Sequence, residues 1–199
     1  MSGAFPISSA KFESLGIKST QNTIISKSQS GKKLARQIDG QRFGFTARII
    51  TAKRSDVYGE LMAFIIKQRS GKENFTIIPP EVEDARGTAS GIPHGTASAG
   101  ATSITLGGTG TGTLKAGDFI KFANHDKIYM VVADQSDIST GSLTIEPPLT
   151  TAVSSSDITY DNVPFTVHLT NDMQEFGVVG ADKDGNALYQ FEFDVEEAL

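Results

Sequence analysis

The sequence predicts a mainly β protein of the α+β class with one α-helix, in which a small all-β module interrupts a larger core domain. Segments of alternating polar and apolar residues recur along the chain, as expected for half-buried strands. One stretch has the apolar spacing of a helix of useful length. A stretch rich in Gly, Ala, Ser and Thr separates two groups of strands, and 199 residues suffice for one core and a satellite module.

The central part, Gln41 to Pro80, is predicted as strand, amphipathic helix and strand. Arg42 to Ile50 alternates, with phenylalanines on one face. We expect Ser55 to cap a helix of about four turns, which Gly71 ends in a left-handed conformation. Asn74 to Ile78 alternates again, before two prolines stop the pairing of this strand.

The N-terminal part is predicted as a hairpin that leads into this unit. Residues 1–16 show no clear pattern and are given no strand. Ile17 to Ser28 is rich in Thr, Ile and Ser and is predicted as an early strand, and Lys32 to Gln37 as the strand that returns.

Residues 87–162 are predicted as the inserted module, so the core domain is discontinuous and comprises residues 1–86 and 163–199. Residues 81–103 have little to bury and are expected to be a linker or an extended arm. Five short strands then indicate a small barrel or sandwich. They are Thr102 to Leu106, Asp118 to Phe122, Ile128 to Ala133, Leu143 to Glu146 and Asp157 to Tyr160.

The C-terminal part completes the core. Pro164 to Thr170 and Leu188 to Val195 alternate cleanly and bring the predicted core sheet to five or six strands. The turn at residues 182–186 joins them. Its Asp182, Asp184, Gly185 and Asn186 are also typical of the first half of a calcium loop, but Phe193 stands where the closing Glu belongs, so a hairpin turn is favoured.

Composition narrows the functional classes. The absence of cysteine excludes disulfides, thiolate metal sites and cysteine nucleophiles. We see neither a signal peptide nor a run of about twenty apolar residues. The net charge is −5, but residues 1–85 hold 13 Lys and Arg against 8 acids, and residues 163–199 hold 1 against 8. Such asymmetry fits subunits that pair across an interface, and equally a fold that mixes the charges within one molecule.

Catalytic signatures are weak. The glycines after Leu106 lead into a strand rather than into the helix of a phosphate loop. His125 with Asp126, and His168, are candidate acid–base groups, but no catalytic motif surrounds them. The cations of the first half lack the interleaved aromatics of a nucleic-acid surface. We therefore expect no enzyme activity, no cofactor and no metal.

Three stretches resemble bacteriophage tail-tip proteins of the distal tail, or tail-tube-like, family. Gln41 to Pro80 is similar in its Arg-aromatic-X-aromatic strand, Ala-Phe helix and Gln-Arg-X-Gly exit. LKAGDFIKFANHDKIYMVVAD, Leu114 to Asp134, is similar to a small β module of phage virion proteins. VPFTVHLTNDMQEFGV and YQFEFDVEEAL resemble their C-terminal hairpin. Tube, tube-terminator and baseplate hub proteins share this core fold, and no residue here separates them.

The resemblance implies a tail-tube-like β-sandwich or rolled sheet with a flanking helix. It implies a homo-oligomeric, hexameric ring of the virion tail or baseplate, assembled in the host cytoplasm, that joins the tail tube protein to hub and tip proteins. DNA passes through the lumen without specific binding, and C-terminal acids are expected to line that lumen. The alternative is a host-surface adhesin in which the inserted module binds carbohydrate.

Two sets of residues are expected to form the functional surfaces. The subunit interface is expected to pair cations around the helix with the acidic C-terminal segment: Arg48, Lys53, Arg54, Lys67, Arg69, Glu192, Asp194, Glu196 and Glu197. The adhesin alternative places a sugar-stacking face on the module: Phe119, Phe122, His125 and Tyr129.

Overall fold

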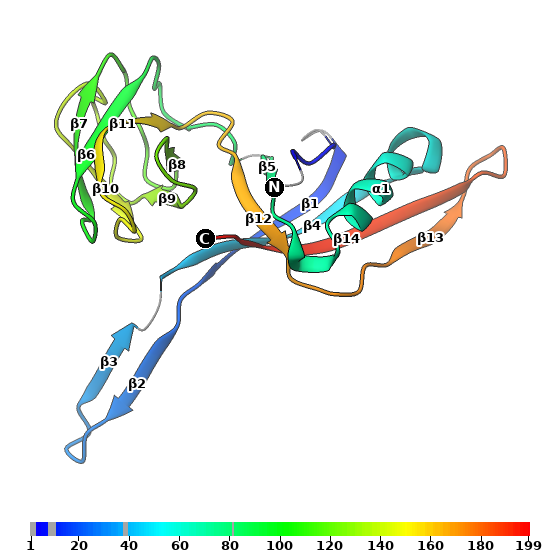
Figure 1. Cartoon of the computed structure of the whole chain (residues 1–199), viewed down its shortest axis with the longest axis horizontal. Coiled ribbons are helices and arrows are strands. Elements are labelled where there is room, and N and C mark those ends of the chain that lie inside the picture. Colours follow the sequence, from blue (N-terminus) through cyan, green and yellow to red (C-terminus); the bar gives the residue numbers. More distant parts are fainter. Residues whose placement is uncertain (1–2, 8–10, 38–39, 81) are drawn as a thin grey trace.

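The computed structural model describes residues 3–7, 11–37, 40–80 and 82–199. Strands make up 48% of the structure, with a single short α-helix, which confirms the predicted mainly β, α+β class. The described strands form a six-stranded sheet, a closed six-stranded barrel and a separate two-stranded hairpin. In Figure 1 the barrel lies at one end of the sheet, and the hairpin projects away from both.

The sheet has the order β1-β4-β14-β12-β5, with β13 paired to β14, and every pairing is antiparallel. Its strands come from both ends of the chain: β1 Phe12–Thr20, β4 Arg42–Lys53, β5 Phe75–Ile77, β12 Phe165–Leu169, β13 Phe176–Ala181 and β14 Ala187–Glu197. The expected five or six core strands are thus present, as one sheet rather than two facing sheets.

One face of this sheet forms the core. Phe43, Phe45, Ala47 and Ile49 of β4 are all at most 4% exposed, because the strand turns every second side chain to the same side. Phe191, Phe193 and Val195 of β14 bury the same face. The predicted alternation in both strands is confirmed, and the opposite face carries the polar residues.

The helix α1, Gly59–Lys67, covers the core face (Figure 1), following a π-helical turn at Arg54–Tyr58. Leu61 and Ile65 are buried beneath it. Both predicted caps are wrong. Ser55 donates to the carboxylate of Asp56 instead of capping, and Arg69 and Ser70, not Gly71, have positive φ angles after the helix ends.

The hairpin comprises β2, Thr23–Lys27, and β3, Lys33–Gln37, so the predicted returning strand is confirmed. We call this hairpin the arm. The strand predicted over Ile17 to Ser28 is divided, because residues 17–20 belong to β1 and pair with β4. The expectation of no strand in residues 1–16 is wrong, because β1 begins at Phe12 and pairs along β4 as far as Thr20. The sequence also missed β13, which is rich in Gly and Val and gains its pairing from β14.

The barrel contains β6 Pro93–Ala97, β7 Ser103–Gly108, β8 Phe119–Phe122, β9 Ile128–Val131, β10 Ser142–Glu146 and β11 Val153–Thr159. Five of these were predicted. The sixth, β6, lies in the stretch expected to be linker, so that expectation is wrong for residues 93–97. Gly95 is required in β6, since a Cβ there would lie 2.5 Å from the ring of Phe122 inside the barrel.

Candidate assembly surfaces

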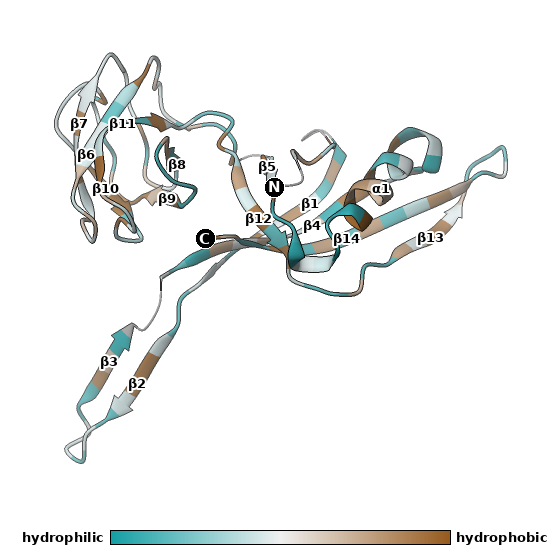
Figure 2. Ribbon diagram, viewed as in Figure 1, coloured by the Kyte–Doolittle hydropathy of each residue, from teal (hydrophilic) through white to brown (hydrophobic). Residues whose placement is uncertain are grey.

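The arm is the most exposed element of the molecule. Every residue of β2 is exposed, and Ile24, Ile25 and Leu34 show 57%, 56% and 53% of their surface to solvent. Figure 2 shows these apolar positions among hydrophilic ones along the projecting ribbon. A two-stranded hairpin on its own is marginally stable in water, so an arm with uncovered apolar side chains is typical of a contact element.

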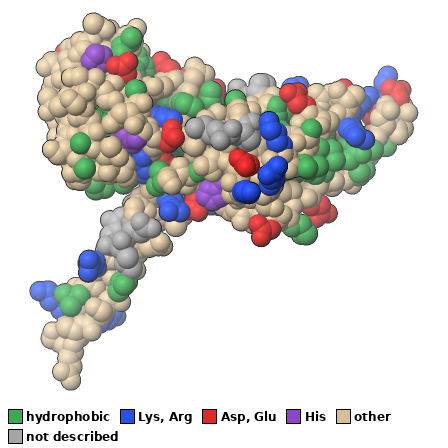
Figure 3. Space-filling model, in the orientation of Figure 1, with side chains coloured by type: hydrophobic (Ala, Val, Ile, Leu, Met, Phe, Trp, Pro, Cys, Tyr) green, Lys and Arg blue, Asp and Glu red, His purple; other side chains and the backbone are tan. Residues whose placement is uncertain are grey.

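The arm is also strongly basic. Residues 21–37 contain Lys27, Lys32, Lys33 and Arg36 and no acid. Basic and hydrophobic side chains are visible together on it in the space-filling view (Figure 3). The arm therefore combines apolar contact area with a positive field that favours an acidic partner surface.

A second surface is the free edge of β13. This strand has no charged residue from Phe176 to Ala181, and Val178 and Val179 are 60% and 54% exposed. Edge strands in soluble proteins are normally blunted by charges, prolines or covering segments, because their unpaired backbone groups recruit other strands. Charged residues, mostly acids, flank this edge: Asp172 and Glu175 precede it, and Lys183 and Asp184 follow it in the turn.

The hairpin that carries this edge is closed by the predicted turn. Asp182 accepts hydrogen bonds from the backbone of Asp184 and from the backbone and side chain of Asn186, and it pairs with Lys53. The side-chain amide of Asn186, and then Lys53, hold the pKa of Asp182 well below its usual range. The predicted hairpin turn is thus present.

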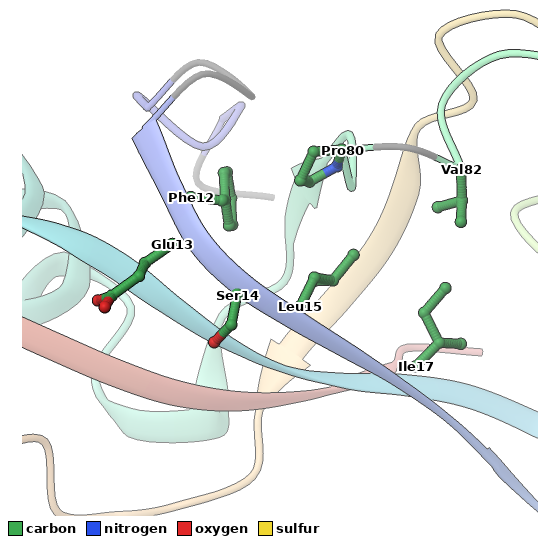
Figure 4. Close-up of a pocket in the computed structure, with 7 residues that line it drawn as sticks. All are labelled: Phe12, Glu13, Ser14, Leu15, Ile17, Pro80 and Val82. Atoms are coloured by element: carbon green, nitrogen blue, oxygen red, sulfur yellow. The ribbon is translucent and has the colours of Figure 1, made fainter.

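A shallow groove of about 460 Å³ lies along the other free edge, β1. Figure 4 shows Phe12, Leu15 and Ile17 of β1 together with Pro80 and Val82, which line it. Within the described ranges, no group of three or more His, Asp or Glu side chains is placed to hold a metal ion. Glu13 and Ser14 also line the groove, so it presents polar as well as apolar surface beside the free edge of β1.

Several members of the expected interface set are paired within their own chain. Lys53 pairs with Asp182, Arg48 lies 3.7 Å from Glu192, and Asp194 pairs with Lys18 at 2.7 Å and accepts from Thr46. Hydrogen bonds from Lys18 and Thr46 lower the pKa of Asp194. Folding thus already brings part of the basic and acidic halves together within one chain, and Lys53 and Asp194 have partners there. Their contact with a neighbouring subunit stays a prediction.

Among the residues expected at the subunit interface, Glu197 differs most from the prediction. It is 1% exposed and accepts from Lys127, so it belongs neither to a solvated C-terminal surface nor to a lumen lining. Arg54, Lys67, Arg69 and Glu192 remain exposed, and Glu196 is half-buried beside His168 in the strand pairing.

The expected sugar-stacking face is wrong as well. Phe119, Phe122 and Tyr129 are at most 4% exposed. Phe119 packs toward the sheet, whereas Phe122 and Tyr129 lie inside the barrel. His125 is half-buried against them and lies 2.8 Å from the hydroxyl of Tyr129, and burial lowers its pKa. These aromatics are core residues, since alternation in a short barrel strand does not show which side is inside.

The arm and the open sheet edges are surfaces of the kind that structural subunits use for contact with one another. Residues 84–163 match the family model described as distal tail protein pb9, B domain. A search of curated proteins gives no match for this chain. The matched segment contains all six barrel strands, so the barrel is similar to the B domain of a phage distal tail protein. This similarity supports the resemblance drawn from the sequence and a structural role in the phage tail.

Among the described residues, no helix has the length and apolar character to cross a membrane. The matched family is one of structural phage tail proteins, which supports a component of the virion tail.

Proposed function

We propose that the chain is the subunit of a homo-oligomeric, hexameric ring at the distal end of a phage tail, where it joins the tail tube to hub and tip proteins of the baseplate. The observation that carries this proposal is the match to a distal tail protein in a chain that also has an exposed arm and open sheet edges. The ring is assembled in the host cytoplasm and DNA passes through its lumen.

The arm and the β13 edge are the proposed ring contact. Ile24 and Ile25 on a basic arm match the exposed Val178 and Val179 on an edge flanked by acids. A second copy of the chain supplies both halves of this contact, the arm from one subunit and the edge from the next. A heterologous contact of this kind, repeated head to tail, closes into a ring when its rotation permits.

The domain division follows from this arrangement. Residues 1–86 and 163–199, which hold the sheet, helix and arm, form the ring body, and residues 87–162 stand outside it as the barrel. The sheet face opposite the helix carries charges of both signs, including Lys18, Arg48, Glu192 and Asp194, which largely pair with one another. A lumen lined by this face has few free cations to hold DNA phosphates.

The test is sedimentation velocity of the purified chain together with three variants. Ile24→Asp places a carboxylate on the arm, Val178→Asp places one on the β13 edge, and Ile92→Asp is the matched control. Ile92 is a 52% exposed isoleucine outside the sheet and the arm. We expect a mass of about six copies for the wild type and for Ile92→Asp, and monomers for the other two, since a buried unpaired charge costs several kcal/mol.

A wild type that remains monomeric at every concentration, alone and with tail tube protein, would contradict the ring. A wild-type ring that survives both Ile24→Asp and Val178→Asp would place the contact elsewhere on the molecule.

A further inference from the structure

The barrel is attached to the sheet through two chain connections that lie side by side. Residues 83–85 lead into the barrel and residues 161–163 lead out. The backbone of Val163 donates to Glu83 at 3.1 Å, and Asn162 and Ala85 each donate to a carboxylate on the other segment at 3.2 Å. Two connecting segments paired in this way act as one hinge, so a separate contact is needed to stop the barrel from rotating about it.

Such a contact exists where β8 and β9 meet the sheet. The ring of Phe119 lies edge-on to Phe43 of β4 at 5.2 Å and packs against Phe165 of β12 at 5.6 Å. Ile128 joins the same buried cluster. Figure 1 shows the barrel beside the end of β14 at this point. Apolar contacts stabilise the joint, but they are non-directional and do not by themselves select one orientation.

A buried polar cluster occupies the centre of this joint. Lys127 and Glu197 are each 1% exposed, and the ammonium of Lys127 lies 2.5 Å from Oε2 of Glu197. Lys127 also donates to Oε1 of Gln41 at 3.2 Å and lies 4.9 Å from the centre of the Phe43 ring. Removal from water lowers the pKa of Lys127, and Glu197 opposes that shift.

Glu197 draws its hydrogen-bond partners from two segments, one in the barrel and one in the sheet. Its Oε1 accepts from the backbone of Ile128 at the start of β9 at 2.6 Å, and its Oε2 accepts from the backbone of Phe43 on β4 at 3.2 Å. Lys127 supplies the third hydrogen bond from the barrel. One carboxylate on β14 therefore connects the barrel to two strands of the sheet through directional, charge-assisted hydrogen bonds.

From this geometry we propose that Lys127 and Glu197, with Gln41, set the orientation of the barrel on the sheet. Burying an ion pair costs about as much desolvation free energy as its attraction returns, so a well-packed apolar pair would stabilise the joint equally well. An apolar pair, however, makes no directional hydrogen bonds that could fix the orientation of the barrel. These are positioning residues, and they determine the angle at which the barrel leaves the ring body, which is a role beyond ring formation itself.

The test measures orientation separately from stability. The chain has no cysteine, so Thr140→Cys in the barrel and Lys183→Cys in the β13–β14 turn accept one spin label each. Pulsed electron–electron double resonance then gives the distribution of distances between the two labels. The labelled chain is diluted in excess unlabelled chain, so that only distances within one subunit are measured. The outcome is therefore independent of whether the chain forms a ring.

We expect one narrow distance distribution for the labelled parent chain. Lys127→Met with Glu197→Leu should keep cooperative unfolding but broaden the distribution at least twofold. The matched control, Lys18→Met with Asp194→Leu, removes an exposed ion pair of the sheet and should leave the width unchanged. A distribution as narrow as the parent's, with the same centre, in the Lys127→Met, Glu197→Leu chain would overturn the proposal.

If that double variant does not fold, the width of the distance distribution is measured for Glu197→Gln instead. It keeps the shape and the acceptor for Ile128 but loses the charge, so broadening supports the role and an unchanged width overturns it.

Discussion

At the residue scale, the buried side chains could be predicted only where alternation had a long strand to follow. The phenylalanines of β4 and β14 were assigned correctly because 12 and 11 residues of continuous strand give an unambiguous face. The four-residue strands β8 and β9 gave no such guide, and Phe119, Phe122 and Tyr129 were placed on the wrong side. Lys127 and Glu197 carry no sequence signal, since their pairing depends on how the barrel meets the sheet.

Gly44 is a residue at which the sheet itself can be tested. A Cβ on this position would lie 2.6 Å from the backbone oxygen of Val195, and backbone of a central strand cannot move aside cheaply. We expect Gly44→Ala to lower the free energy of unfolding by about 1–3 kcal/mol through overpacking. Urea unfolding, monitored by circular dichroism, measures this difference in the free energy of unfolding.

The matched control is Gly16→Ala in the neighbouring strand β1, where the nearest atom to a new Cβ is 4.0 Å away. Equal stabilities of the two variants would show that β4 and β14 do not approach as closely as described.

At the element scale, the missed strands share a composition. β6 and β13 are built largely from Gly, Ala, Val and Thr, which have little local pattern, and both gain their structure from pairing with a neighbour distant in sequence or joined by a turn. The arm was predicted from β-propensity and its turn, but its exposure was not, because propensity does not show whether a hairpin packs. The apolar stripe of the helix predicted its presence, whereas its ends could not be predicted because they depend on tertiary contacts.

The β13–β14 hairpin should be sensitive to acid. Because the pKa of Asp182 is lower in the folded chain than the ordinary value of 3.8, its stabilising contribution is fully present above that value. The contribution is lost as the pH falls from about 3.8 toward the folded-state pKa. We therefore expect the protection of β13 amides in hydrogen exchange to decrease over that range.

Asp182→Asn should lower this protection already at neutral pH and flatten its decrease at low pH. Asp184→Asn is the matched control, since it removes a charge from the same turn without removing the carboxylate that accepts from Asn186. If the Asp182→Asn chain shows the same acid-dependent decrease as the wild type, another group holds the hairpin.

At the scale of the whole molecule, the uneven charge of the sequence has two consequences. Part of it is neutralised within the chain, where Lys18, Arg48 and Lys53 meet Asp194, Glu192 and Asp182. The charges that remain exposed include those of a basic arm on one side and the acids beside the β13 edge on the other. The sequence alone could not separate the paired charges from the exposed ones, because the order of the strands in the sheet decides which charges meet.

The most direct measurement of the proposed assembly uses the same lack of cysteine. A chain with Ile25→Cys on the arm and Val178→Cys on the β13 edge is treated with a short bismaleimide and separated by denaturing electrophoresis. Head-to-tail contact predicts a ladder of linked chains that ends at about six copies, and each single-cysteine chain should give no ladder. A ladder absent from the double-cysteine chain, or one that stops at dimers, would contradict a ring closed by arm and edge.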